Sequence, residues 1–117
     1  MHEFSLALGL TEELKSIARK EGEARVKDVH ISIGALSGIV RESFEWGFEV
    51  IKESESFLKD AKLLIETEHP AYKCIKCGYT VEEENIPSLL CPVCKGTEFL
   101  PLGGDDLRLM RVELEIE

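Results

Sequence analysis

Residues 74–94 read CIKCGYTVEEENIPSLLCPVC and contain all four cysteines of the chain, as Cys74-x-x-Cys77 and Cys91-x-x-Cys94. Residues 78–90 separate the two pairs, which is close to the spacing of a zinc ribbon, where a hairpin joins two tight turns. Each pair places two thiolates on one turn, so that four sulfur atoms can surround an ion at about 2.3 Å. The stretch therefore predicts a closed, structural metal site formed by Cys74, Cys77, Cys91 and Cys94.

The ligand set alone does not choose the metal. Four thiolates in a tetrahedron select zinc or iron, and the segments 72–79 and 91–94 are also similar to the knuckles of rubredoxin. We assign zinc first and keep an iron-bound electron carrier as the alternative. Two disulfides are a weaker interpretation, because we expect no secretory leader ahead of the pairs and paired Cys-x-x-Cys spacing favours a metal.

Charge and hydropathy exclude other classes of protein. The 117 residues include 14 basic and 23 acidic side chains, which gives a formal net charge of −9. Proteins that bind nucleic acid present basic faces to phosphate, so we expect no nucleic-acid partner. No apolar run approaches about 18 residues, so we expect no membrane span. Reduced cysteines need a reducing compartment, and the cytoplasm is the simplest prediction.

A hydrophobic core is expected outside the cysteine segment. Apolar residues recur at intervals of three and four over 4–19 and again over about 42–57, which predicts two amphipathic helices. Gly22 fits the end of the first helix. Apolar, partly alternating runs predict strands over 26–34, 62–68 and 107–116, with Ala35–Val40 as a loop.

This order of elements predicts an α/β (α+β) fold, in which two helices cover a small three-stranded mixed sheet and a zinc ribbon is inserted into the sheet domain. The strand–helix–strand crossover should make its two strands parallel. We expect a helix–sheet domain over 1–71, completed by 104–117, and an inserted zinc-ribbon domain over 72–103. Gly103-Gly104 would serve as a flexible joint between them.

The opening residues Met1, His2 and Glu3 predict a second and different metal site. The Met1 amine, the His2 amide and the His2 imidazole can chelate one ion in adjacent small rings, and the Glu3 amide or carboxylate can supply a fourth ligand. Square-planar nitrogen and oxygen ligation suits Ni²⁺ and Cu²⁺. From chemistry alone, a solvated histidine is the commoner explanation of His2.

Several segments together resemble the hydrogenase nickel-insertion protein family HypA/HybF. They are the opening MHEFSL, residues 33–40 (IGALSGIV), the phenylalanines of the second helix, Ala61-x-Leu63-x-Ile65 and residues 104–107 (GDDL). Lys95 stands where the family usually has glycine, and Arg41 where proline often begins the helix. The resemblance implies a nickel metallochaperone that carries Ni²⁺ to the large subunit of [NiFe]-hydrogenase with the GTPase HypB, and that has Zn²⁺ as a structural ion.

The remaining residues give no catalytic arrangement. The ribbon would use every cysteine, so none remains to act as a catalytic nucleophile. No other nucleophile paired with a base, and no pair of catalytic carboxylates, is evident in the sequence. We therefore predict that the protein is not an enzyme. His30 is interpreted as a solvated residue on the polar face of a strand. Besides the metallochaperone, the alternatives are the rubredoxin-like electron carrier and a zinc-ribbon adaptor that binds another protein. We expect a monomer or weak homodimer.

Overall fold

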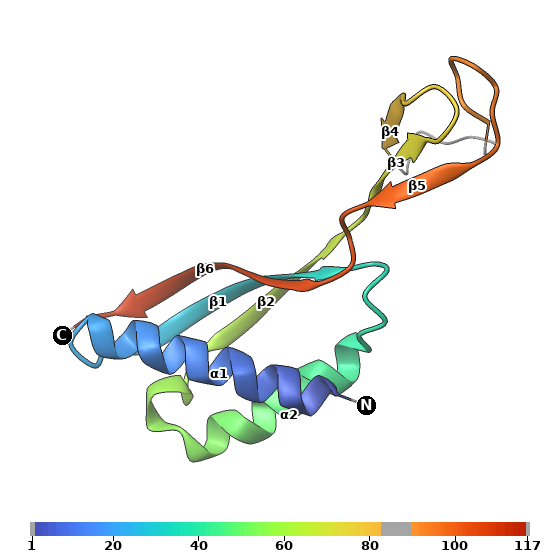
Figure 1. The fold of residues 1–117 in the computed structure, drawn as a ribbon. Coiled ribbons are helices and arrows are strands. Elements are labelled where there is room, and N and C mark those ends of the chain that lie inside the picture. Colours follow the sequence, from blue (N-terminus) through green and yellow to red (C-terminus); the bar gives the residue numbers. More distant parts are fainter. Residues whose placement is uncertain (1, 83–89, 117) are drawn as a thin grey trace. The chain divides into compact units, whose positions relative to one another are not determined.

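The computed structural model describes residues 2–82 and 90–116. In chain order the elements are α1 (Glu3–Lys20), β1 (Arg25–Gly34), α2 (Arg41–Ser54), the 3-10 turn η1 (Ser56–Leu58), β2 (Lys62–Glu68), β3 (Ala71–Cys74), β4 (Thr80–Glu82), β5 (Phe99–Leu102) and β6 (Leu107–Glu115). They build two three-stranded sheets, ordered β2-β1-β6 and β4-β3-β5. In Figure 1, β1 and β2 run in one direction, β6 returns, and α1 and α2 lie on the same face of this sheet. The predicted fold class is confirmed.

The chain divides into two compact units. The helix–sheet unit comprises Met1–Ser32, Ile39–Glu66 and Arg108–Glu117, and the four-cysteine unit comprises Ile33–Gly38 and Thr67–Leu107. Backbone hydrogen bonds explain why the segment 33–38 belongs to the second unit. They run from the amides of Gly34, Ala35 and Leu36 to the carbonyls of Asp106, Glu68 and Gly104, at 2.8, 2.8 and 2.7 Å respectively. The domain bounds predicted from the sequence stay a prediction and differ from these units at residues 33–38, 67–71 and 104–107.

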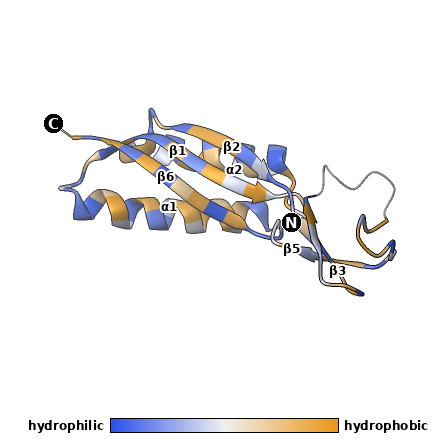
Figure 2. Cartoon of the chain, turned by 90° about the horizontal axis from the view of Figure 1, so that it is seen from above, coloured by the Kyte–Doolittle hydropathy of each residue, from blue (hydrophilic) through white to orange (hydrophobic). Residues whose placement is uncertain are grey.

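The core of the helix–sheet unit follows from the spacing of its apolar residues. Helix α1 buries Ala7, Leu10, Leu14 and Ala18, which lie three and four residues apart and so share one face. Figure 2 shows the hydrophobic and hydrophilic bands that alternate along this helix. On the sheet side, Val29 and Ile31 of β1 are fully buried, because alternate residues of a strand point to the same face.

Helix α2 packs against α1 through its own apolar face, which consists of Phe44, Gly47, Phe48 and Ile51. The absence of a side chain at Gly47 matters here. A Cβ atom at this position would lie 3.2 Å from Cδ1 of Phe4, so glycine lets the start of α1 lie close against α2. In the described ranges, neither helix is long and apolar enough to cross a membrane.

The second predicted helix ends earlier than expected. Helix α2 stops at Ser54, and Glu55 takes an extended conformation (φ −121°, ψ 108°) before the short turn η1. This turn brings Leu58 into the core with 0% of its surface exposed, and β2 then begins at Lys62, as the sequence predicted. The predicted end at residue 57 was therefore wrong by about one turn. The helix ends at Ser54 because the chain has to reverse direction within a few residues to enter β2.

Candidate functional site

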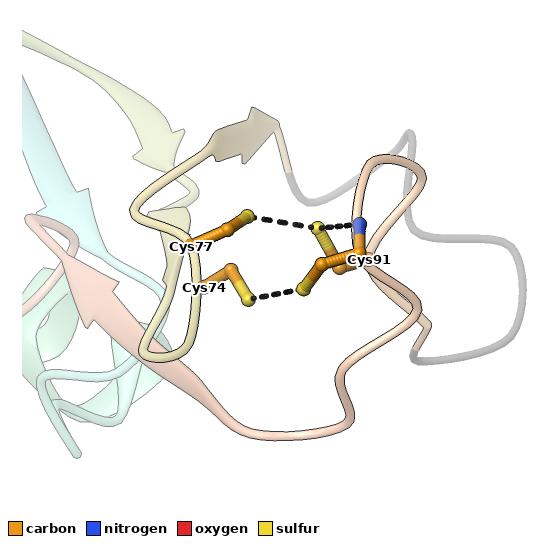
Figure 3. A group of neighbouring side chains, drawn as sticks. Cys74, Cys77 and Cys91 are labelled. Atoms are coloured by element: carbon orange, nitrogen blue, oxygen red, sulfur yellow. Dashed lines mark hydrogen bonds between the residues drawn. The ribbon is translucent and has the colours of Figure 1, made fainter.

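Four cysteine side chains converge within the four-cysteine unit. Cys74 is the last residue of β3, which pairs antiparallel with both β4 and β5, and Cys77 follows in the adjoining turn. The Sγ atoms of Cys74 and Cys94 are 3.5 Å apart, as are those of Cys77 and Cys91. Figure 3 shows Cys74 and Cys77 directed toward the segment that carries Cys91. The structure therefore brings together all four predicted ligands, and all four are free cysteines.

The two turns that carry these cysteines have the same backbone design. In the first, the Gly78 amide donates to the Cys74 carbonyl, and in the second the Lys95 amide donates to the Cys91 carbonyl, each at 2.8 Å. A further bond closes each turn, from the Cys74 amide to the Tyr79 carbonyl and from the Cys91 amide to the Gly96 carbonyl, again at 2.8 Å. The turns over 74–79 and 91–96 thus present their sulfur pairs in equivalent ways.

The fifth position of each turn needs a left-handed backbone. Gly78 has φ +81°, and Lys95, its counterpart, has φ 63°. A side chain costs roughly 1–2 kcal/mol in this conformation, whereas glycine adopts it freely. Gly96 is favoured for a different reason, since a Cβ atom there would lie in tight contact with two sulfur atoms, 3.2 Å from Sγ of Cys94 and 3.4 Å from Sγ of Cys74. The spacing of the cysteines alone did not reveal this constraint.

Backbone amides point at the sulfur atoms and favour their charged form. The amides of Val93 and Cys94 lie 3.4 and 3.5 Å from Sγ of Cys91, and the Gly96 amide lies 3.4 Å from Sγ of Cys94. The Cys94 amide is the main reason that the pKa of Cys91 falls to about 6. In the first turn, the amide of Cys77 lowers the pKa of Cys74 in the same way.

The pKa of Cys77 shifts in the opposite direction, upward. The amide of Tyr79 acts to lower the pKa of Cys77, but desolvation and the neighbouring sulfur atoms of Cys91, Cys94 and Cys74 outweigh it and raise this pKa to about 12. Negative charges this close repel one another, so a nearby cation is needed to stabilise the thiolate form of Cys77 beside the other three sulfur atoms.

These observations fit a bound metal ion. A disulfide would hold its sulfur atoms about 2.05 Å apart, much less than the 3.5 Å seen for both pairs. All four sulfur atoms lie within 4.8 Å of one another, as the corners of a tetrahedron around one ion would. Zn²⁺ held by Cys74, Cys77, Cys91 and Cys94 would leave no coordination position open, which is the arrangement of structural zinc sites.

The predicted nickel ligands lie at the start of α1. His2 is exposed, makes no side-chain capping hydrogen bond and accepts at its carbonyl the amide of Leu6 at 2.9 Å. Glu3, in contrast, is only 7% exposed, and its Oε2 accepts the Val40 amide at 3.1 Å. Met1, the third predicted ligand, lies outside the described residues.

The electrostatics of Glu3 keep its carboxylate charged. The positive amine of the chain end, the Val40 amide and the amide of Glu3 itself lower the pKa of Glu3 to about 2. Near neutral pH this side chain is therefore an anion fixed beside the first residues of the chain. Sequence reasoning did not find the Val40 contact, because 37 residues separate the two groups.

The structure also brings together a group that was not predicted. One ligand atom from each of Asp28, His30 and Glu113 lies within 4.8 Å of the others, and all three residues are half-buried. The sequence predicted His30 to be a solvated strand residue. Its partner Glu113 belongs to a distant part of the chain, so no local pattern could have paired them.

Comparison with known proteins gives one consistent family. The family model described as "Hydrogenase/urease nickel incorporation, metallochaperone, hypA" matches residues 1–114. The hydrogenase maturation factor HypA of Campylobacter jejuni is 36% identical over 116 residues, covering 98% of this chain and 100% of the relative. The HypA protein of Aquifex aeolicus is 34% identical over 117 residues, with full coverage of both chains.

Solved structures agree with these relatives over the whole chain. The solution structure of the nickel metallochaperone HypA from Helicobacter pylori is similar with a TM-score of 0.72, 26% sequence identity and full coverage of both chains. Another solution structure of a HypA protein gives a TM-score of 0.77 at 26% identity and covers 100% of this chain and 98% of the other. The family and the fold are therefore shown by independent comparisons.

Proposed function

Because the chain belongs to the HypA family of hydrogenase and urease nickel-incorporation metallochaperones, we propose that it binds Ni²⁺ at its N-terminus and delivers it to the large subunit of [NiFe]-hydrogenase. A protein of this family is a maturation factor and not an enzyme. Membership in this family favours a maturation factor over the rubredoxin-like electron carrier and the zinc-ribbon adaptor. We propose hydrogenase as the client because the similar curated relatives are named as hydrogenase maturation factors.

The observation that carries the nickel proposal is the pairing of an exposed His2 with a fixed, charged Glu3. His2 stands directly before α1, where the first amides of a helix have no acceptor within the helix. The Met1 amine, the His2 amide and imidazole, and Glu3 would supply the nitrogen and oxygen donors that suit Ni²⁺. Anchored through its bond to Val40, Glu3 would hold the chain end in place while the ion binds.

The two metal sites are suited to different tasks. Four thiolates would enclose Zn²⁺ completely, whereas ligands at an exposed chain end leave nickel accessible to an acceptor protein. The nitrogen donors must lose protons to bind the metal, so nickel affinity falls on acidification. We therefore assign Zn²⁺ a structural role and treat Ni²⁺ as cargo.

The partners and compartment follow from the same proposal. The GTPase HypB would act with this protein, and the large subunit would receive the ion. The charge of −9 argues against nucleic acid. Four free cysteines require a reducing compartment, so we propose the cytoplasm, with the protein present as a monomer or weak homodimer.

Nickel calorimetry tests the proposal directly. His2→Ala, and separately an extension of the chain ahead of Met1, should each weaken nickel binding at least about tenfold, because each removes a nitrogen ligand. His69→Ala is the matched control, since it also removes an imidazole but not from the chain end. All variants should retain their zinc and the melting temperature of the parent. Unchanged nickel affinity in both altered proteins would refute an N-terminal site.

A delivery assay then tests the client. Nickel-loaded protein should activate purified apo large subunit in the presence of HypB and GTP, and His2→Ala should fail at limiting nickel. Excess nickel should partly restore activity by mass action. Full activation by the His2→Ala protein at limiting nickel would show that delivery does not pass through this histidine.

A further inference from the structure

One cluster of metal-ligating side chains remains outside both sites described above. Asp28 and His30 lie on β1, and Glu113 lies on the neighbouring strand β6. Asp28 and His30 flank Val29, which is fully buried, so they point to the sheet face opposite the core side. Figure 1 shows β1 and β6 side by side, with both helices on one face of their sheet. All of these residues belong to the helix–sheet unit.

Arg111, two residues before Glu113 on β6, bridges two members of this cluster. Its Nη2 lies 2.8 Å from Oε1 of Glu113 and 3.3 Å from Nε2 of His30. A guanidinium group can only donate hydrogen bonds, so Nε2 of His30 must act as the acceptor. Nε2 can accept this bond in the tautomer that carries its proton on Nδ1, which leaves the lone pair at Nε2. This is the form of histidine that binds metals.

The position of Arg111 marks the cluster as a place for a cation. One positive group already bridges a carboxylate and an imidazole nitrogen, and a carboxylate oxygen of Asp28 lies within the same 4.8 Å group of ligand atoms. The Arg111 side chain is 64% exposed and can swing into solvent without disturbing the core. The three ligand residues are half-buried and therefore more restrained than the arginine.

We propose that Asp28, His30 and Glu113 form a further site for a first-row divalent metal ion, and that Arg111 occupies this site as a counter-charge until the metal displaces it. One imidazole and two carboxylates suit ions such as Zn²⁺ or Ni²⁺, with water completing the coordination. The two carboxylates balance the charge of a divalent ion. The site shares no residue with the N-terminus or with the four cysteines, so it does not depend on the proposed nickel site.

Zinc titration of full-length His2→Ala protein, with its four-cysteine site already loaded, isolates this cluster. Histidine NMR should show the His30 ring signals moving on saturation with one equivalent of added Zn²⁺. His30→Ala should weaken this binding at least about tenfold, as the loss of a ligand does. Glu113→Gln, which keeps the shape of the side chain, should weaken it in the same direction.

Arg111→Ala supplies the sharper test. If the arginine only holds the site in shape, its removal should weaken zinc binding, whereas removal of a counter-charge that the metal displaces should tighten it. Zinc must displace the arginine, a contact worth about as much as one unit-charge pair at 4 Å in water, so removing the arginine should tighten zinc binding about fivefold. Arg25→Ala is the matched control, since Arg25 lies on β1 and its side chain is 58% exposed. Weaker binding in Arg111→Ala, or unchanged binding in His30→Ala, would overturn the proposal.

Discussion

The helix–sheet unit and the four-cysteine unit bury different kinds of group. In the first, the largest fully buried side chains include Phe44, Phe48 and Leu14. In the second, Cys74 and Cys91 are among the few buried residues of the part that the structure describes, while Ile75 and Val93 are both 63% exposed. The first unit therefore has a hydrophobic core of apolar side chains. In the second, cysteine side chains take the buried central positions.

This difference shows how one short chain can maintain two units. Burial of apolar surface stabilises the helix–sheet unit and requires no ligand. The described part of the four-cysteine unit buries little apolar surface, so we expect its folding energy to come from the ion that its sulfur atoms would surround. The two units should therefore respond independently to substitutions and to chelators.

The largest expected effect is on the four-cysteine unit. Cys91→Ala removes one of four ligands, and the metal-binding free energy at stake is about 10–16 kcal/mol for a site of this type. We expect the metal to be lost and the unit to unfold, while the helix–sheet unit persists. Zinc content per chain and amide hydrogen exchange, analysed unit by unit, measure both effects.

Val93→Ala is the control for that experiment, because its side chain lies in the same turn and is mostly exposed. It should retain the metal and the parent exchange pattern. Full zinc occupancy in Cys91→Ala would contradict the four-cysteine site, and loss of both units together would contradict their independence.

The second-largest expected effect is on the helix–sheet unit. Phe48→Ala leaves a cavity in the core of the helix–sheet unit and should destabilise it by about 3–5 kcal/mol. Zinc content should not change. Trp46→Ala, on the same helix but 67% exposed, should change stability by less than about 0.5 kcal/mol. Denaturant unfolding followed by helix content measures both variants, and equal losses of stability would contradict the burial described here.

The smallest effect concerns the two equivalent turns. Lys95→Gly should stabilise the metal-bound four-cysteine unit by about 1 kcal/mol, because Lys95 holds a positive φ that glycine adopts without cost. Gly78→Ala, at the corresponding position of the other turn, should destabilise it by a similar amount. Competition with a chelator measures both changes. A shift of the same sign in both variants would show that the turns are not equivalent.

Much of the fold could be predicted from the sequence, because local spacing carries the information. Apolar residues three and four positions apart predicted α1 and α2, and alternation predicted β1, β2 and β6. The two Cys-x-x-Cys pairs predicted the cluster of sulfur atoms. There were two exceptions. The reversal after Ser54 depends on where the chain must enter the sheet and not on the local pattern, and the strands β3, β4 and β5 of the second sheet were not predicted.

The chain's own residues thus determined its two helices, the strands of its first sheet, the pairing of its four cysteines and the donor atoms available in its first residues. Only the tertiary structure decided that Val40 donates to Glu3, that Gly96 lies against two sulfur atoms, and that Arg111 bridges His30 and Glu113. The physical reason is the range of the interactions. Periodicity and turn chemistry act between residues a few positions apart, whereas these contacts depend on how the helices, strands and turns pack.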